Sequence, residues 1–132
     1  MEVNEKVEKC KFCKLLKEKN LDFENELAFA FWDANPVSKG HIIFMTKRHV
    51  RDFFETTKEE KNAIFELIDK AKCIIDEKYK PTGYNIGMNC GVSAGQTVMH
   101  IHVHLIPRYD GDVENPRGGV RGVIPEKRDY CN

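Results

Sequence analysis

The stretch His100-Ile101-His102-Val103-His104 alternates three histidines with two apolar residues, and Leu105 continues the alternation. Successive side chains of a β-strand point to opposite faces of the sheet. We therefore predict a strand over residues 97–107, with the three histidines on one face and the apolar residues between them on the other. Neighbouring imidazoles would then lie about 7 Å apart, close enough to flank one phosphate group.

The regions before this stretch predict the rest of an antiparallel sheet. Residues 26–33 and 41–45 are predicted strands, and residues 35–40, with Pro36 and Gly40, are a turn that pairs them as a hairpin. Tyr84, Ile86 and Met88 alternate with Asn85, Gly87 and Asn89, which predicts a further strand with one buried face.

One long helix is predicted between the two halves of this sheet. It begins at Thr57, whose hydroxyl forms a capping box with Glu60, and Pro81 and Gly83 end it. Its core-facing stripe comprises Ile64, Leu67, Ile68, Ala71 and Ile75. A short helix is predicted over residues 12–19, ending at Asn20. This order indicates an α+β fold in one domain over residues 1–132, with the Gly-rich, basic tail 109–132 predicted to be irregular.

The composition limits the possible partners. The 132 residues carry 21 basic and 21 acidic side chains, so no overall field draws the chain to nucleic acid or an anionic membrane. The first ten residues lack the apolar core of a signal peptide, and no later apolar run is long enough to span a membrane. We expect a soluble cytoplasmic protein. The five cysteines, an odd number, therefore favour reduced thiols or metal ligands over disulfides.

The residues alone leave three interpretations of the histidine run. It can be a polar strand face in solvent, although imidazole is the side chain that exchanges protons near neutral pH. It can be a three-histidine catalytic zinc site formed by His100, His102 and His104. It can also support covalent catalysis, in which a neutral imidazole attacks phosphorus and water resolves the phosphorylated histidine.

Two stretches resemble the histidine triad (HIT) superfamily. They are residues 95–108, GQTVMHIHVHLIPR, and residues 33–49, which contain Pro36 and the pairs Gly40-His41 and Arg48-His49. The resemblance runs from about residue 10 to residue 108, and residues 115–122 are similar to the tails of some bacterial and archaeal members. It implies nucleotide hydrolases or transferases that act at an α-phosphate, built on a five-stranded antiparallel sheet and joined as homodimers through their sheets.

The resemblance also implies roles for single residues. His102 is the nucleophile, His104 contacts the phosphate and the leaving group, and His41 assists. Asp33 matches a position that binds the ribose hydroxyls, although aspartate there also suits the start of a turn. The phosphate-side loop is matched by Asn89, Gly95, Gln96 and Thr97. Asn89 can instead be a local backbone hydrogen-bonder, and Thr97 fits a strand on propensity alone.

The pair Cys10 and Cys13 has the spacing of half a zinc site, and a closed structural site needs four ligands. Resemblance to the zinc-containing branch of the family, and to galactose-1-phosphate uridylyltransferase, implies that His49 and His100 complete it. His100 would then bind one structural zinc ion per chain, and His102 and His104 would be the two catalytic histidines of the strand.

The substrate is left open between diadenosine polyphosphates, with an accompanying divalent cation, and nucleoside phosphoramidates or adenylated amines. Basic residues gather in the last quarter of the chain: Arg108, Arg117, Arg121, Lys127 and Arg128. They can bind further phosphates, or they can belong to a solvated, mobile tail. A nucleotide-binding module without catalysis is the alternative from another functional class.

Overall fold

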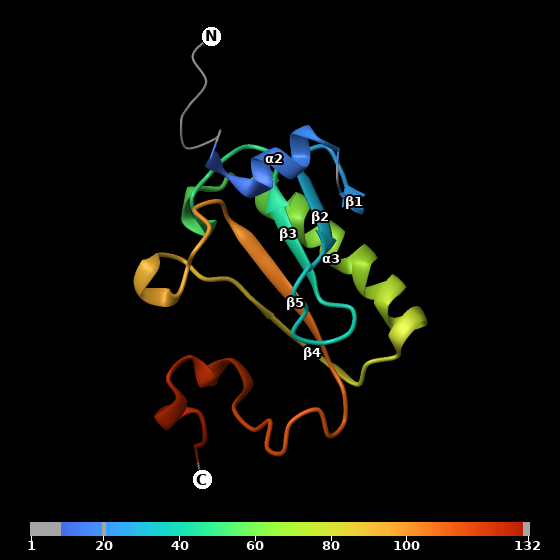
Figure 1. Ribbon diagram of the computed structural model, residues 1–132, viewed down its shortest axis with the longest axis vertical. Coiled ribbons are helices and arrows are strands. Elements are labelled where there is room, and N and C mark those ends of the chain that lie inside the picture. The colour runs from blue at the N-terminus through green and yellow to red at the C-terminus, as the bar shows by residue number, and fades with distance from the viewer. Residues whose placement is uncertain (1–8, 20, 131–132) are drawn as a thin grey trace.

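The computed structural model describes residues 9–19 and 21–130, so the charged residues 1–8, the predicted helix end Asn20 and Cys131 lie outside the described part. Within it, five antiparallel strands form one sheet in the order β1-β2-β3-β5-β4 (Figure 1). Their bounds are β1 Phe23–Glu24, β2 Ala28–Trp32, β3 Ile42–Thr46, β4 Gly83–Gly87 and β5 His102–Arg108. The predicted α+β fold with a five-stranded antiparallel sheet is confirmed.

The long helix α3, Lys58–Tyr79, covers one face of this sheet. Thr57 and Glu60 form the predicted capping box, and the helix is capped at its other end by Lys80 in a left-handed conformation. Its buried apolar stripe packs against the inward residues of β2, β3 and β5, among them Phe44 and Val103. None of the helices in residues 9–19 and 21–130 has the length and apolar character to cross a bilayer.

The short helix α2, Lys11–Lys17, lies over one end of the opposite face (Figure 1). Phe12 is buried beneath it against Phe29 and Met45 of the sheet. The burial of β5 alternates along its length, so Val103 and Leu105 face the α3 core while His102 and His104 lie half-buried on the α2 side. The predicted separation of histidines from apolar residues is therefore confirmed within the strand.

Two strand predictions are wrong in detail. The last strand begins at His102 and not at Thr97, because the backbone bends through residues 98–100 and the Ile101 N–H donates to the Val50 carbonyl (2.8 Å) instead of to a strand ladder. A short 3₁₀ helix, η2 Val92–Ala94, precedes this bend. Ile86 does not share a buried face with its neighbours but is 52% exposed, since β4 is the edge strand.

The tail is more ordered than predicted. It contains two short 3₁₀ helices, η3 Gly119–Val123 and η4 Pro125–Lys127. Outside the tail, the 3₁₀ helix η1, Phe53–Glu55, precedes α3. Gly118, with φ +89°, starts η3 where a Cβ would overlap the Arg128 carbonyl.

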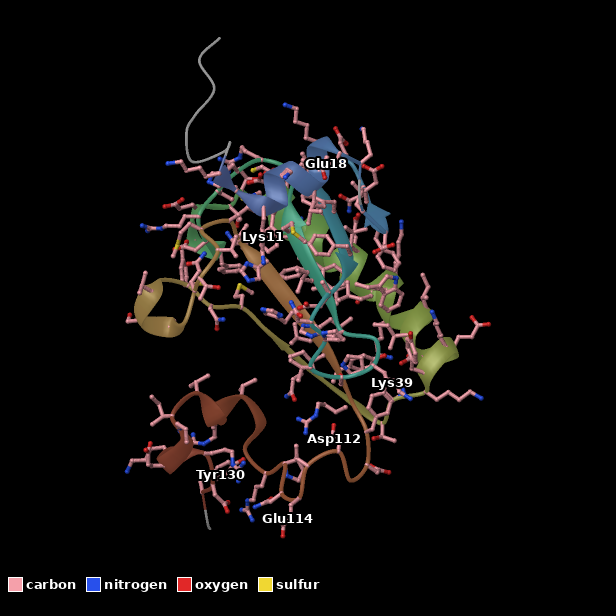
Figure 2. The ribbon with its side chains drawn as sticks, viewed as in Figure 1. Lys11, Glu18, Lys39, Asp112, Glu114 and Tyr130 are labelled. Atoms are coloured by element: carbon pink, nitrogen blue, oxygen red, sulfur yellow. The ribbon has the colours of Figure 1, made fainter. Side chains whose placement is uncertain are left out.

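Three of the C-terminal arginines make contacts within the chain. The guanidinium groups of Arg117 and Arg121 lie over the ring of Tyr130, the residue labelled in Figure 2, and Arg117 pairs with Asp129 (3.4 Å). Arg108, the last residue of β5, donates two hydrogen bonds to Asp112, each 2.8 Å long.

Candidate functional site

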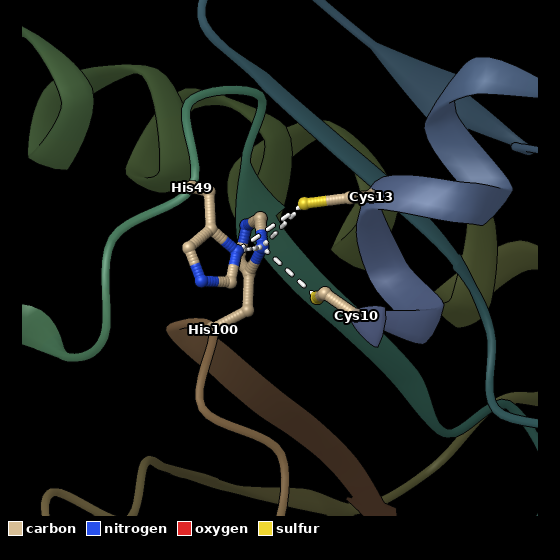
Figure 3. A group of neighbouring side chains, drawn as sticks. All are labelled: Cys10, Cys13, His49 and His100. Carbon is tan, nitrogen blue, oxygen red and sulfur yellow. Dashed lines mark hydrogen bonds between the residues drawn. The ribbon is translucent and has the colours of Figure 1, made fainter. Parts of the chain in front are cut away.

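Four side chains from distant parts of the sequence converge at the α2 end of the sheet (Figure 3). Cys10 and Cys13 come from the start of α2, His49 from the loop after β3, and His100 from the bend before β5. The His100 Nδ1 atom lies 3.5 Å from both sulfur atoms and 3.2 Å from the His49 Nδ1 atom, and the Cys13 sulfur lies 3.2 Å from His49.

These distances fit a tetrahedral zinc site. With Zn–S and Zn–N bonds of ordinary length, the edges of such a tetrahedron measure roughly 3.3–3.8 Å. The His100 Nε2–H donates to the Thr46 carbonyl (2.7 Å), which leaves the Nδ1 lone pair directed at the two sulfurs. His100 is 0% exposed, and Cys10 is also buried. The geometry therefore brings together all four predicted metal ligands.

The electrostatics of this cluster also suit a cation. Burial, followed by the neighbouring Cys10, raises the pKa of the Cys13 thiol to about 12. Burial lowers the pKa of His100 to about 4, which keeps its imidazole neutral near pH 7. A metal ion supplies the positive charge that stabilises thiolates in such a site.

His102 presents its other ring nitrogen to the open face of the sheet. Its Nδ1–H donates to the backbone carbonyl of His100 (2.9 Å), so the neutral ring carries its lone pair on Nε2. Burial lowers the pKa of His102, and the positive charge of Lys11 adds to that effect. The edge of the Phe12 ring packs against the imidazole, with ring centroids 5.0 Å apart. These contacts hold a neutral imidazole with an unprotonated nitrogen available for attack.

His104 and His41 form a hydrogen-bonded pair beside it. The Val37 N–H donates to His41 Nδ1 (3.1 Å), so the His41 proton is on Nε2, which donates to His104 Nδ1 (2.9 Å). This leaves an N–H on His104 Nε2. Burial lowers the pKa of His41, and it lowers the pKa of His104 to about 4. The His102 and His104 ring centroids are 5.2 Å apart, so an unprotonated ring nitrogen and an N–H donor lie on adjacent imidazoles.

The residues do not assemble the alternative three-histidine zinc site. Among the described residues, ligand atoms gather in two groups, Cys10 with Cys13, His49 and His100, and Asp33 with His41 and His104. The Nδ1 atoms of His100 and His102 have different partners, the thiols for one and a backbone carbonyl for the other. His100 is therefore grouped with the thiols and not with the other two histidines of the run.

Asp33 lies at the end of β2 with its carboxylate divided between two contacts. Oδ1 accepts from the Asn35 N–H (2.8 Å), which is the turn-starting role that the sequence left open. Oδ2 lies 3.4 Å from His41 Nε2. The carboxylate is thus beside the histidine pair, at the rim of the open face.

The loop before β5 contains the other predicted substrate residues. The Gln96 side chain is 3% exposed and fully used: it accepts from the Gly91 N–H and donates to the carbonyls of Arg51 and Val98. In these contacts the Gln96 side chain braces the loop. Gly95, at φ +95°, makes the turn that Gln96 braces. Thr97 lines a surface cavity of about 610 Å³, and Asn89 is exposed after β4.

Two contributors escaped the sequence analysis. Phe12 packs its ring against both His100 and His102, and the Thr46 carbonyl orients His100. Phe12 stands between the two cysteines, which is the one signal that pointed to it. The backbone carbonyl of Thr46 leaves no trace in a sequence.

Comparison with known proteins agrees with this geometry. Residues 16–111 match the HIT domain family. The chain belongs to that family. It is 34% identical over 101 residues to the bis(5'-adenosyl)-triphosphatase of Dictyostelium discoideum, covering 76% of this chain and 68% of that protein.

Two solved structures show the same relationship for the fold. A HIT family protein from Bacillus anthracis has a TM-score of 0.73 and 36% identity, and the match covers 90% of this chain and 89% of that one. A zinc-bound histidine triad family protein from Mycobacterium smegmatis has a TM-score of 0.74 and 28% identity, over 83% of this chain and 81% of that one.

Proposed function

We propose that this HIT protein is a nucleotide hydrolase or transferase in which His102 attacks the α-phosphorus of its substrate. The observation that carries the proposal is the hydrogen bond from His102 Nδ1–H to the His100 carbonyl, which leaves Nε2 unprotonated on the open face of the sheet. A neutral, oriented imidazole is what covalent catalysis at phosphorus requires.

In the first step, the Nε2 lone pair forms a bond to the α-phosphorus and the bond from phosphorus to the leaving group breaks. The electron pair of that bond stays on the leaving atom, which accepts a hydrogen bond from the His104 Nε2–H. A polyphosphate leaves as an anion, and an amine takes its proton from water. The His41 Nε2–H donates to His104 Nδ1 and so keeps the His104 proton on Nε2. In the second step, a water oxygen bonds to phosphorus as the bond from phosphorus to His102 Nε2 breaks, which frees the neutral imidazole, releases a nucleoside monophosphate and returns one proton to solvent.

The substrate is proposed to be a dinucleoside polyphosphate or an adenylated compound, with AMP as a product. The relative named bis(5'-adenosyl)-triphosphatase supports this class. Asp33 would bind the ribose hydroxyls, while Thr97 and the backbone amides near Asn89, Gly95 and Gln96 would meet the phosphate oxygens. A divalent cation would enter with a polyphosphate substrate as its counter-ion.

The cluster of Cys10, Cys13, His49 and His100 is proposed to hold one structural zinc ion. All four protein ligands would be used, so no position remains for a reacting water, and the ion would stabilise the fold. The site would affect the chemistry through His100, because this residue would bind the metal with its side chain and orients the His102 imidazole with its backbone carbonyl.

A homodimer joined through the sheets is proposed as the assembled form. β4 is an edge strand with its outer backbone groups unpaired, and Ile86 exposes half of its side chain there. Sedimentation of the purified protein tests this: a mass of two chains is expected, and replacing Ile86 with Lys should yield the monomer. A monomeric starting protein would refute this assembly.

The activity is tested by AMP release from a panel of diadenosine polyphosphates and adenosine phosphoramidates, run with and without brief chelation of exposed metal. We expect release that survives chelation on at least one class when the cation of the substrate is supplied again. Chelation that stops phosphoramidate turnover at once would instead favour a catalytic metal. AMP binding without any turnover would favour a binding module.

A further inference from the structure

The cavity beside the zinc-ligand cluster has no role in the proposed chemistry. It measures about 610 Å³, and its walls come from the start of α2, the loop after β3 and the loop before β5. Its walls include Lys11, Val50, Arg51, Thr97, Val98 and Met99, and also Glu55, whose carboxylate lies 3.6 Å from the Arg51 guanidinium. His41, His102 and His104 are not among its lining residues, so the cavity is a neighbour of the reacting centre and not the centre itself.

Lys11 joins this cavity to the nucleophile. It is an exposed side chain at the first position of α2, and Figure 2 labels it beside the start of β5. Its Nζ atom lies 5.4 Å from the centroid of the Phe12 ring, and that ring lies 5.0 Å from the His102 ring. The ammonium and the reactive imidazole therefore border the same aromatic side chain, and the Lys11 charge acts on His102.

The charge of Lys11 is available to a ligand. Within the described part of the chain, no carboxylate lies within ion-pair distance of Lys11. Arg51 on the same cavity differs, because its guanidinium lies 3.6 Å from both Asp52 and Glu55. Among the residues that the structure describes, Lys11 is thus a cation without a carboxylate partner, and it lies between the cavity and the Phe12 ring.

The remaining wall suits an apolar or aromatic group. Val50, Val98 and Met99 present aliphatic and thioether surface, and methionine packs well against flat rings of varied shape. Thr97 lines the same cavity, at a position that the resemblance matches to the phosphate-side loop. The cavity therefore combines a cation, a hydroxyl-bearing residue and apolar surface.

We propose that Lys11 and this cavity bind the portion of the substrate beyond the scissile phosphate, with Lys11 on the departing polyphosphate and Val98 and Met99 against the second base. This inference rests on the proposed function and narrows its substrate. A departing polyphosphate gains negative charge when the bond to the α-phosphorus breaks, whereas a departing amine does not. Lys11 therefore favours dinucleoside polyphosphates over phosphoramidates.

The test compares Lys11→Gln with Lys17→Gln, an exposed lysine of the same helix that does not line the cavity. Loss of a charge-assisted contact of about 1.4 kcal/mol corresponds to a tenfold effect. We expect Lys11→Gln to lower kcat/KM for diadenosine tetraphosphate about tenfold. The kcat/KM for an adenosine phosphoramidate should stay within about twofold of the native value. Lys17→Gln should change neither. An equal fall for both substrates, or none for the tetraphosphate, overturns the proposal.

A binding measurement separates this inference from the proposed activity. In a His102→Ala background, Lys11→Gln should weaken diadenosine tetraphosphate about tenfold and leave the dissociation constant of AMP unchanged. This result is expected even if the chain hydrolyses neither substrate, in which case the proposed activity fails and the binding role of Lys11 stands. Unchanged tetraphosphate affinity rejects the role of Lys11 whether or not the chain is an enzyme.

Discussion

His100 and His102 stand two residues apart and use opposite ring nitrogens. His100 donates Nε2–H to the Thr46 carbonyl and turns Nδ1 toward the thiols of Cys10 and Cys13. His102 donates Nδ1–H to the His100 carbonyl and leaves Nε2 on the open face. The backbone partner of one nitrogen thus decides what the other nitrogen can do.

Burial separates the two residues further. His100 is 0% exposed, and its Nδ1 atom faces the two thiols. His102 is half-buried on the strand itself, next to His104. In the proposed scheme, the buried histidine has an anchoring role at this closed end of the run, and the half-buried one has a chemical role at the open end.

The largest expected effect is a loss of activity at His102 without a loss of metal at His100. We expect His102→Ala to lower AMP release about 10⁴-fold or more while the metal content stays at one ion per chain. Removal of the nucleophile leaves the Thr46 carbonyl and the thiol cluster in place, so the protein should unfold at nearly the same temperature. Turnover assays with metal analysis on one preparation check both; activity within tenfold of the native protein contradicts the covalent scheme.

The closed end is tested by Cys13→Ser. Loss of one thiolate from a four-ligand site should release the metal and destabilise the fold by about 3 kcal/mol or more, or about 10 °C in Tm. Calorimetry and metal analysis measure the change. The matched control is Cys73→Ser, an exposed cysteine on α3 that lies outside the cluster. Equal Tm values for the two variants would show that the cluster is not a structural metal site.

His41 should contribute less than the nucleophile. His41→Ala removes the partner of His104 Nδ1, so the proton on His104 Nε2 is less well positioned, and kcat should fall about 10²-fold. KM should change little because His41 lies behind His104 and is almost fully buried. His41→Gln, whose amide can donate to His104, should recover part of the loss. A raised KM with native kcat would instead assign His41 to substrate binding.

The smallest effect is a dependence of stability on pH at the open end. Burial lowers the folded-state pKa of His104 to about 4, below its ordinary value near 6.5. Between these values the unfolded chain binds a proton that the folded chain does not, so stability falls as the pH drops from 6.5 to 4. Across that window Tm should fall by several degrees more in the native protein than in His104→Asn. Equal slopes would contradict a buried neutral His104.

Much of the fold follows from local patterns in the sequence. The capping box at Thr57 and the helical stripe behind it set the start and orientation of α3, and the alternation in β5 separates core from open face. Cys10 and Cys13 drew attention by spacing alone. Their two histidine partners came from the family resemblance, because residues 36 to 90 positions away carry no mark of proximity.

The errors share one physical cause, which is that side-chain patterns do not report backbone partners. The alternation runs through His100, but the Ile101 N–H bonds to Val50, so the ladder starts at His102. The three backbone contacts of the Gln96 side chain likewise leave no mark in the sequence. Ile86 fits a buried face until the sheet order makes β4 an edge.

The central claim is that one strand run separates a metal anchor from a nucleophile, and rapid acid quenching during turnover tests it most directly. Peptide mass spectrometry of the quenched protein should find the nucleotidyl group on His102, absent from His100 and His104, in a protein that holds one zinc per chain. Steady turnover with no adduct, lost when the metal is removed and restored when it returns, would contradict the account.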